Sequence, residues 1–217
     1  MPGREYIDEL KRDYRAKKPL IIKRLDEFRK VYEEGDRAVF EELCYCILTA
    51  GSSAKMGMRT VEALRDILIT GTRQELQRRA KENRARFWRV RPAYIVQTRE
   101  FLRDTYGMKL RKLIGSFDSR HERRDFFAKN KGIKGIGYKE ASHFLRNIGF
   151  TGYAILDKHI LNSLREMRVI STRMRPTTRA GYLAIEKKLE QFSKEIGIDM
   201  DHLDLLLWSR KTGQILK

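Results

Sequence analysis

The sequence has few of the residues that build disulfide frameworks or metal centres. Only two of its 217 residues are cysteine, Cys44 and Cys46. Residues two positions apart on a helix point in different directions, so we expect no disulfide between them. Two thiols are also too few for the four ligands of an iron–sulfur cluster. The four histidines form no HxxxH or HExxH pair, and we therefore expect no catalytic metal.

Long apolar segments are missing as well. The N-terminal stretch MPGREYIDELKRDYRAKK has no apolar core of the kind found in signal peptides. The longest apolar run, residues 44–50, is far too short to cross a bilayer. These features lead us to expect an intracellular protein that does not enter the membrane.

Negative charge is scarce relative to positive charge. The chain has 47 Lys and Arg against 29 Asp and Glu, a net charge of +18. This excess favours a polyanionic partner, nucleic acid first and an anionic membrane surface second. A solvated basic surface is the alternative explanation. Charged residues make up 35% of the chain, a share that is also typical of proteins from thermophiles.

Strand-like alternation of apolar and polar residues is not seen over any segment of six or more residues. The apolar spacing is instead helical almost throughout. Two sequences fit the capping box that opens a helix, Thr72 with Glu75 and Ser119 with Glu122. One apolar stripe precedes Gly71, where a helix would stop; it consists of Val61, Leu64, Ile67 and Leu68. The sequence predicts an all-α protein of roughly ten short helices.

Glycines cluster in KNKGIKGIGYKEASHFLRNIGF, residues 129–150. This pattern predicts a helix over residues 120–130, a glycine turn, and a second helix from about Tyr138. Gly135 and Gly137 remove Cβ atoms where a phosphate would meet main-chain N–H groups, and the second helix adds N–H donors and a partial positive charge. A plain turn between helices is the alternative. The high net charge favours the phosphate clamp.

Lys139 lies in the first turn of the second helix. There its ammonium would face the positive end of the helix dipole and the side chains of Lys131 and Lys134, which favours a free amine that can act as a nucleophile. A lysine that only binds phosphate is the alternative, and spacing alone favours it. Asp157, further along, can cap the next helix. Such a carboxylate could stabilise an oxocarbenium-like sugar while the amine attacks C1′.

The stretch GIKGIGYKEASHFLRNIG followed by AILDKHI resembles the helix-hairpin-helix, Gly/Pro-rich loop and aspartate signature of the base-excision DNA glycosylases. Together with ELCYCILTA, RFWRVRPAYIV and LLLWSRKTGQILK, it is similar to the second family of 8-oxoguanine DNA glycosylases, the archaeal and thermophilic-bacterial type. The resemblance implies two helical subdomains with the active-site cleft between them, one from residues 1–50 and 140–217 and one from residues 51–139. It places the helix-hairpin-helix at about residues 120–148.

The resemblance also implies catalytic and base-recognition residues. Lys139 matches the family's Schiff-base nucleophile, and Asp157 matches the aspartate of the signature. Phe87 and Trp208 match the side chains that sandwich the extruded base, although either could instead be a structural residue. The carboxylate of Lys217, at the chain end, matches the group that reads the edge of the oxidised base.

In the hairpin, the resemblance assigns Gly135 and Gly137 to the DNA backbone. In relatives, main-chain carbonyls of the hairpin can hold a monovalent cation that bridges to a DNA phosphate; the matching residues are Lys131, Ile133 and Ile136. This chain departs from the family after ILTA, where relatives usually carry a polar amide residue that enters the gap left by the base. Here Gly51 stands at that position, followed by Ser52 and Ser53.

The function implied is that of a bifunctional 8-oxoguanine DNA glycosylase and AP lyase. It would flip the base, cleave the N-glycosidic bond through a lysine Schiff base, and nick the strand by β-elimination. We expect a monomer in the prokaryotic cytoplasm, acting at the nucleoid on double-stranded DNA that contains 8-oxoguanine, with no required cofactor. The alternatives are a superfamily member for another lesion, a non-catalytic helix-hairpin-helix DNA-binding module, and a basic RNA-binding protein.

Overall fold

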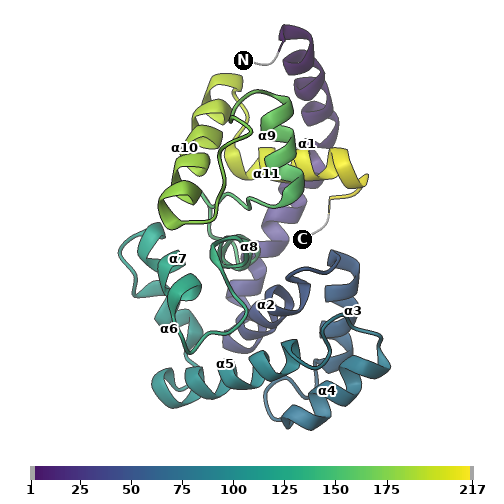
Figure 1. The fold of residues 1–217 in the computed structure, drawn as a ribbon, viewed down its shortest axis with the longest axis vertical. Coiled ribbons are helices and arrows are strands. Elements are labelled where there is room, and N and C mark those ends of the chain that lie inside the picture. Colours follow the sequence, from purple (N-terminus) through teal and green to yellow (C-terminus); the bar gives the residue numbers. More distant parts are fainter. Residues whose placement is uncertain (1–2, 216–217) are drawn as a thin grey trace. The chain divides into compact units, whose positions relative to one another are not determined.

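The protein is described by a computed structural model over residues 3–215, and within these residues it contains α-helices and no strand (Figure 1). The helices are α1 (Arg4–Glu33), α2 (Asp36–Thr49), α3 (Ala54–Leu64), α4 (Arg73–Glu82), α5 (Arg91–Tyr106), α6 (Leu110–Gly115), α7 (Arg120–Lys129), α8 (Tyr138–Asn147), α9 (Lys158–Glu166), α10 (Arg179–Ile196) and α11 (Met200–Thr212). The prediction of an all-α fold is confirmed.

The chain forms two compact units. Unit 1 consists of Met1–Glu27 and Phe150–Lys217, and unit 2 is Phe28–Gly149. Both ends of the chain therefore belong to one unit and its middle to the other. The divisions predicted from the sequence, after residues 50 and 139, differ from these. Residue 50 directly follows α2 and residue 139 lies within α8, and both helices belong to unit 2. Helix α8 stays with unit 2 because it packs against α2 and α7.

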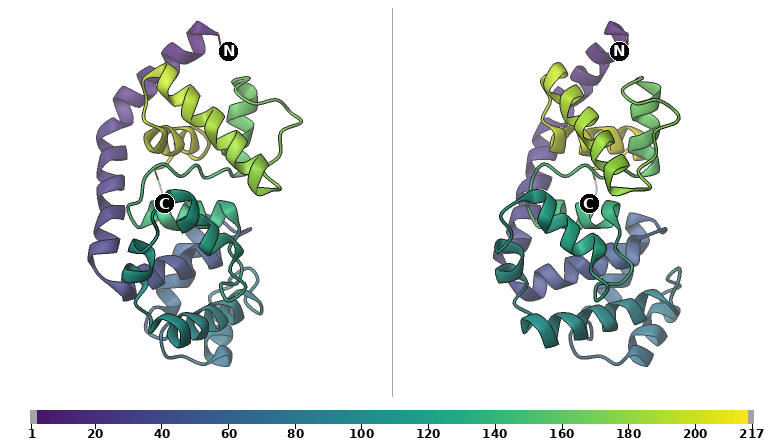
Figure 2. Two further views of the ribbon diagram at one scale, coloured as in Figure 1. Left: turned by 90° about the vertical axis from the view of Figure 1, so that its left-hand side faces the viewer. Right: turned by 60° about the vertical axis from the view of Figure 1, so that its left-hand side comes forward.

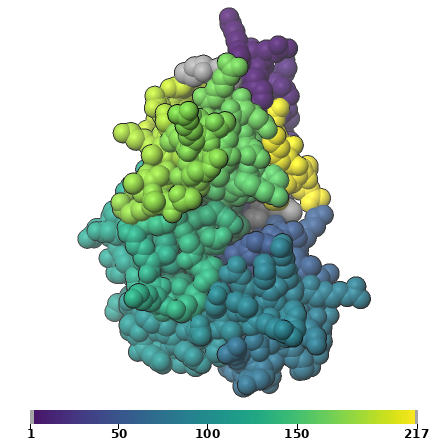
Figure 3. Space-filling model, viewed as in Figure 1, coloured from purple at the N-terminus to yellow at the C-terminus, as the bar shows by residue number. Residues whose placement is uncertain are grey.

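Helix α2 is the central helix of unit 2. Nearly all its residues from Val39 to Thr49 are buried, and it packs against α3, α5, α6 and α8. A helix that is apolar on every side needs neighbours on every side, which explains this central place. Helices α3, α4 and α5 lie next to one another on one surface of unit 2 (Figure 3).

The apolar stripe that ends at Gly71 is only partly helical. Helix α3 ends at Leu64, and residues 65–70 form turns. The buried guanidinium of Arg99, on α5, donates hydrogen bonds of 2.9 Å to the main-chain oxygens of Leu68 and Gly71. These carbonyls thus have partners outside a helix, which permits the chain to turn here.

The predicted capping boxes are confirmed. Thr72 caps α4 and Ser119 caps α7, and each exchanges hydrogen bonds with the glutamate three residues later, Glu75 or Glu122. Each box supplies partners for main-chain N–H groups that the first turn of a helix leaves unbonded.

Unit 1 is built from α9, α10, α11 and the first part of α1. Helix α11 packs against both α9 and α10 (Figure 2). Arg210 on α11 forms ion pairs with Glu9 and Asp13 of α1, at 2.8 and 3.2 Å. Nearby, the hydroxyl of Tyr14 hydrogen-bonds Nδ1 of His202 at 2.9 Å. These contacts join the start of the chain to its end.

None of the helices in residues 3–215 combines the length and the hydropathy that crossing a bilayer requires. Over the same residues, His, Cys, Asp and Glu side chains form no cluster of three or more suited to a metal ion.

Candidate active site

The predicted helix-hairpin-helix is present in unit 2. Helix α7 ends at Lys129, residues 130–137 turn the chain, and α8 begins at Tyr138 and packs against α7. Within the turn, Ile133 and Ile136 are buried. The side chain of Asn130 accepts a hydrogen bond from the N–H of Gly132 at 2.9 Å, which closes the first part of the turn.

The three glycines of the hairpin have different surroundings. A Cβ at Gly132 would lie 2.3 Å from the ring of Phe101. Gly135 has φ +76, and a Cβ there would lie 2.7 Å from Nη1 of Arg91 and 2.7 Å from Cδ2 of Tyr94. By contrast, a Cβ at Gly137 would meet nothing closer than Glu140 Oε2, at 3.4 Å. Contacts inside the protein therefore account for Gly132 and Gly135.

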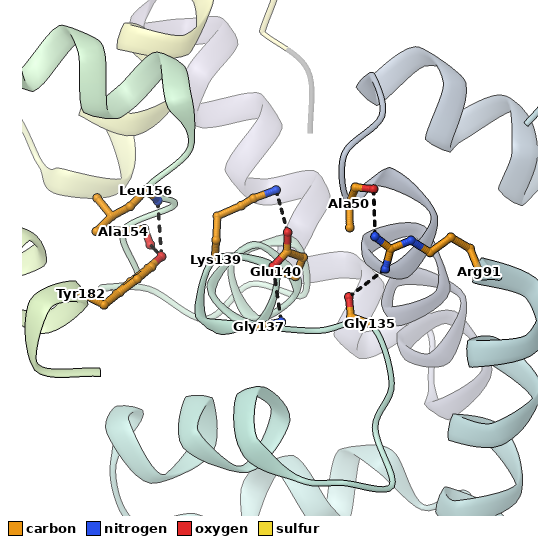
Figure 4. A network of polar contacts seen from close by, with 9 residues as sticks. All are labelled: Ala50, Arg91, Gly135, Gly137, Lys139, Glu140, Ala154, Leu156 and Tyr182. Atoms are coloured by element: carbon orange, nitrogen blue, oxygen red, sulfur yellow. Dashed lines mark hydrogen bonds and ion pairs between the residues drawn. The ribbon is translucent and has the colours of Figure 1, made fainter. Parts of the chain in front are cut away.

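Arg91 joins the hairpin to the loop that follows α2. One guanidinium nitrogen donates to the carbonyl of Ala50 at 3.2 Å and the other to the carbonyl of Gly135 at 3.4 Å (Figure 4). The guanidinium also lies 5.7 Å from the ring centroids of Phe87 and Tyr94. A planar group with several donors suits this task, because it can serve two carbonyls and two rings at once.

Lys139 lies in the first turn of α8, and its amine Nζ is 3.0 Å from Oε1 of Glu140. The other carboxylate oxygen of Glu140 accepts a hydrogen bond from the N–H of Gly137 at 3.3 Å. A single carboxylate thus joins the candidate nucleophile to the last glycine of the hairpin (Figure 4). The prediction for Lys139 rests on the helix dipole and the nearby cations, and it leaves out this neighbouring anion.

Asp157 lies in unit 1 and caps α9. Its Oδ1 accepts hydrogen bonds of 2.8 Å from the N–H groups of His159 and Ile160. The N-cap role predicted from the sequence is confirmed. These two bonds fix the carboxylate against the end of the helix, where the partial positive charge of the helix favours an anion.

Phe87 lies in the loop before α5, in unit 2. Its side chain is 42% exposed and its backbone has φ +62, a conformation that is uncommon for a bulky residue and marks local strain. A Cβ at Gly51 would be 3.4 Å from the Phe87 ring. Arg86 donates to the Gly51 carbonyl at 2.8 Å and lies 4.8 Å from the same ring.

The backbone conformation of Gly51 accounts for part of the departure from the family at this position. Gly51 itself has φ +70, a backbone conformation that side chains rarely adopt. An exposed aromatic ring, two arginines and a left-handed glycine are therefore gathered on one surface of unit 2. Beside them, Trp88 is approached by Lys81 Nζ at 5.2 Å and by the guanidinium of Arg89 at 4.7 Å from the ring centroid.

The remaining predicted residues are placed as follows. Trp208 is half-buried on α11 of unit 1. Lys217 lies outside the described residues. Lys131, Ile133 and Ile136 all lie in the hairpin turn, and their assignment to a monovalent cation stays a prediction.

The structure thus gathers the predicted residues into two sets. Unit 2 holds the hairpin residues, Lys139 and Phe87, whereas unit 1 holds Asp157 and Trp208. Sequence reasoning missed Glu140 and Arg91. A glutamate three residues after a possible N-cap was a signal for Glu140, because glycine is itself an acceptable N-cap. Nothing in the local sequence pointed to Arg91.

Comparison with known proteins gives a consistent result over nearly the whole chain. A family model described as 8-oxoguanine DNA glycosylase matches residues 21–198. The 8-oxoguanine DNA glycosylase/AP lyase of Methanocaldococcus jannaschii is 39% identical, over 97% of each chain. The protein of the same description from Fusobacterium nucleatum is 35% identical over 100% of each chain.

Two solved structures have the same fold as this chain over nearly its whole length. The crystal structure of the M. jannaschii 8-oxoguanine glycosylase/lyase in complex with a 15mer DNA containing 8-oxoguanine has a TM-score of 0.89, with 36% identity over 98% of this chain and 100% of that one. The 8-oxoguanine DNA glycosylase of Thermotoga maritima has a TM-score of 0.88, with 34% identity over 98% and 99% of the two chains.

Proposed function

Because the chain belongs to the 8-oxoguanine DNA glycosylase family, we propose that it removes 8-oxoguanine from double-stranded DNA and then nicks the strand at the abasic site. The observation that carries this proposal is the position of Lys139. Lys139 lies in the first turn of α8, directly after a glycine hairpin that can hold a DNA phosphate.

The damaged nucleotide is first extruded from the duplex, at a cost of a few kcal/mol in lost stacking and pairing. Phosphate contacts of the basic protein offset this cost. The extruded base is stacked by Phe87 and Trp208, and the terminal carboxylate of Lys217 accepts a hydrogen bond at its edge. 8-Oxoguanine has an N–H at N7, where guanine has only an acceptor, so an acceptor close to N7 separates the two bases.

In the chemical step, Lys139 reacts as the free amine, and the carboxylate of Glu140, 3.0 Å from Nζ, accepts the proton. Its amine then attacks C1′, and the bond from C1′ to the base breaks. The negative charge of Asp157 stabilises the positive charge that develops on the sugar. The sugar opens to a Schiff base between C1′ and Nζ. Loss of a C2′ proton and of the 3′ phosphate then cleaves the strand by β-elimination.

Two further features belong to the proposal. The hairpin offers main-chain carbonyls, oxygen donors that can coordinate a monovalent cation, and the residues proposed to provide them are Lys131, Ile133 and Ile136. Gly135 and Gly137 lie along the DNA backbone. Action as a monomer at the prokaryotic nucleoid remains an expectation from the sequence.

Borohydride trapping on a duplex with a single 8-oxoguanine tests the nucleophile. Borohydride reduces the Schiff base to a stable amine, so the wild-type protein should become covalently linked to DNA. Lys139→Gln should give no adduct, although it binds the duplex. Lys134→Gln, a change in the same hairpin, should retain the adduct at saturating protein. An undiminished adduct with Lys139→Gln would show that another group attacks C1′.

Deletion of Lys217 tests the reading of the base. The shortened chain should bind DNA of ordinary sequence as before but lose much of its preference for 8-oxoguanine over guanine. Competition between two duplexes that differ only in this base measures the preference directly. An unchanged preference would remove the terminal carboxylate from the mechanism.

A further inference from the structure

The segment that leads into Asp157 is buried without being helical or extended in a sheet. Residues 150–156 lie between α8 and α9 and have no regular structure. Tyr153, Ala154, Ile155 and Leu156 are at most 7% exposed. Buried main-chain N–H and C=O groups need partners, and a segment of this kind cannot supply them from its own backbone.

Two side chains of α10 supply partners for Ala154 and Leu156. The hydroxyl of Tyr182 donates to the carbonyl of Ala154 at 2.6 Å and accepts from the N–H of Leu156 at 3.3 Å (Figure 4). One helical turn later, the carboxylate of Glu186 accepts from the N–H of Ala154 at 3.0 Å. All four residues lie within unit 1, and Tyr182 is 1% exposed.

The tyrosine hydroxyl takes the place that a neighbouring strand would take. It bonds an acceptor and a donor two residues apart on the same side of the segment, as a strand does. A hydroxyl can do this because it both donates and accepts. The first of the two bonds is short, and the oxygen lies in a buried site where bonds between polar groups are strong.

The position of Asp157 depends on this hydroxyl. Leu156, whose N–H the hydroxyl holds, is the residue directly before Asp157, and the N–H of Asp157 bonds the Ile155 carbonyl at 2.7 Å. The orientation of the peptides on both sides of Leu156 is thus fixed before the carboxylate meets α9. Residues after Asp157 hold it through the cap of α9 and through the N–H of Leu161, which donates to the Asp157 carbonyl at 2.9 Å.

We propose that Tyr182 is a positioning residue for the reaction, because it holds the main chain that carries the Asp157 carboxylate. This inference rests on the proposed function of Asp157 in stabilising the sugar cation. Without the hydroxyl, the Ala154 carbonyl and the Leu156 N–H lose a partner and the segment shifts. A misplacement of about 1 Å at a reacting group can lower a rate by roughly 100-fold.

Tyr182→Phe tests the proposal, because it removes one oxygen and keeps the ring in the core. The rate of 8-oxoguanine release in a single turnover should fall about 10- to 100-fold. The Kd for DNA should stay within about twofold, since the hydroxyl is buried away from solvent. The Kd is measured in the Lys139→Gln background, where the duplex stays intact. Tyr14→Phe is the matched control, since its hydroxyl is bonded to His202 in the same unit; it should release the base at the wild-type rate.

A double-mutant cycle separates positioning from a general loss of stability. Asp157→Asn keeps the N-cap, because asparagine caps a helix as well as aspartate does, and it removes the charge. If Tyr182 acts through Asp157, Tyr182→Phe should have little further effect in the Asp157→Asn background. The same factor in both backgrounds, or a wild-type rate for Tyr182→Phe, would overturn the inference.

Failure of the proposed function gives a different result. If Asp157→Asn alone releases the base at the wild-type rate, the role of Asp157 is overturned and the positioning role with it. Should Tyr182→Phe fail to fold, Glu186→Leu provides the second variant, since it removes the other side-chain bond to Ala154. It should slow base release at an unchanged Kd, and a wild-type rate would again overturn the inference.

Discussion

Gly135→Ala should damage the hairpin, whereas Gly137→Ala should leave it folded. At position 135 the backbone has φ +76, and a side chain in this left-handed region costs about 1–2 kcal/mol. The added Cβ would also lie 2.7 Å from both Arg91 and Tyr94, and overpacking of this kind costs about 1–3 kcal/mol. Together these terms predict that Gly135→Ala lowers the free energy of unfolding by about 2–5 kcal/mol.

Position 137 differs in both respects. Its φ is −108, and the nearest atom to an added Cβ is 3.4 Å away. Glycine is a better N-cap than alanine by about 1 kcal/mol, but alanine reduces the freedom of the unfolded chain by about 0.4–1 kcal/mol. The two terms oppose each other, so the free energy of unfolding should change by less than about 1 kcal/mol.

Guanidinium chloride unfolding followed by circular dichroism measures both variants, and fluorescence anisotropy with a labelled duplex measures their DNA affinity. Gly135→Ala should lose stability and DNA affinity together. Gly137→Ala should weaken DNA binding at nearly unchanged stability, because its Cβ would intrude only on a bound phosphate. Equal destabilisation by the two variants would refute the reasoning, since it relies on the different surroundings of the two glycines.

Three further predictions concern groups outside the proposed site. Burial raises the pKa of the Cys44 thiol well above its ordinary value, and Cys46 is buried too, so a disulfide reagent should label neither thiol at pH 8 until the protein is unfolded. The main-chain N–H and the hydroxyl of Thr72 lower the pKa of Glu75 below its ordinary value of 4.5. The stability gained from this carboxylate is therefore present above that pH and is lost as the pH falls through the lower pKa of the folded protein. The difference in Tm between wild type and Glu75→Gln should shrink from pH 6 to pH 2, and a constant difference would contradict the assignment. Arg99→Met should lower the free energy of unfolding by about 3 kcal/mol, because two buried carbonyls lose a charged donor; a loss below about 1 kcal/mol would show that water replaces the guanidinium.

The hairpin could be predicted from the sequence because local rules determine it. The Ser119 and Glu122 pair set the start of α7, and the glycines set the turn before Tyr138. The structural reason why position 135 requires glycine could not be predicted. We assigned Gly135 to phosphate access, but its left-handed backbone and its contacts with Arg91 already require glycine.

Contacts between distant residues could not be predicted from one sequence. Arg91 bonds carbonyls that are 41 and 44 positions away, in Ala50 and Gly135. The hydroxyl of Tyr182 reaches a segment 26 to 28 positions earlier. No pattern of apolar residues encodes such bonds, because each depends on how helices pack. The catalytic roles proposed for Lys139 and Asp157 come from the family resemblance, since residue chemistry alone left a phosphate-binding lysine and a plain N-cap as alternatives.

The two tryptophans are distributed in a way that is useful for spectroscopy. The chain has only Trp88 and Trp208, and one lies in each compact unit. Replacing either one with phenylalanine leaves a single indole whose emission reports on one unit alone. Two such variants, unfolded in parallel, give separate midpoints for the two units. Coincident midpoints mean that the chain unfolds as one cooperative block, and separate midpoints show which unit holds its structure longer.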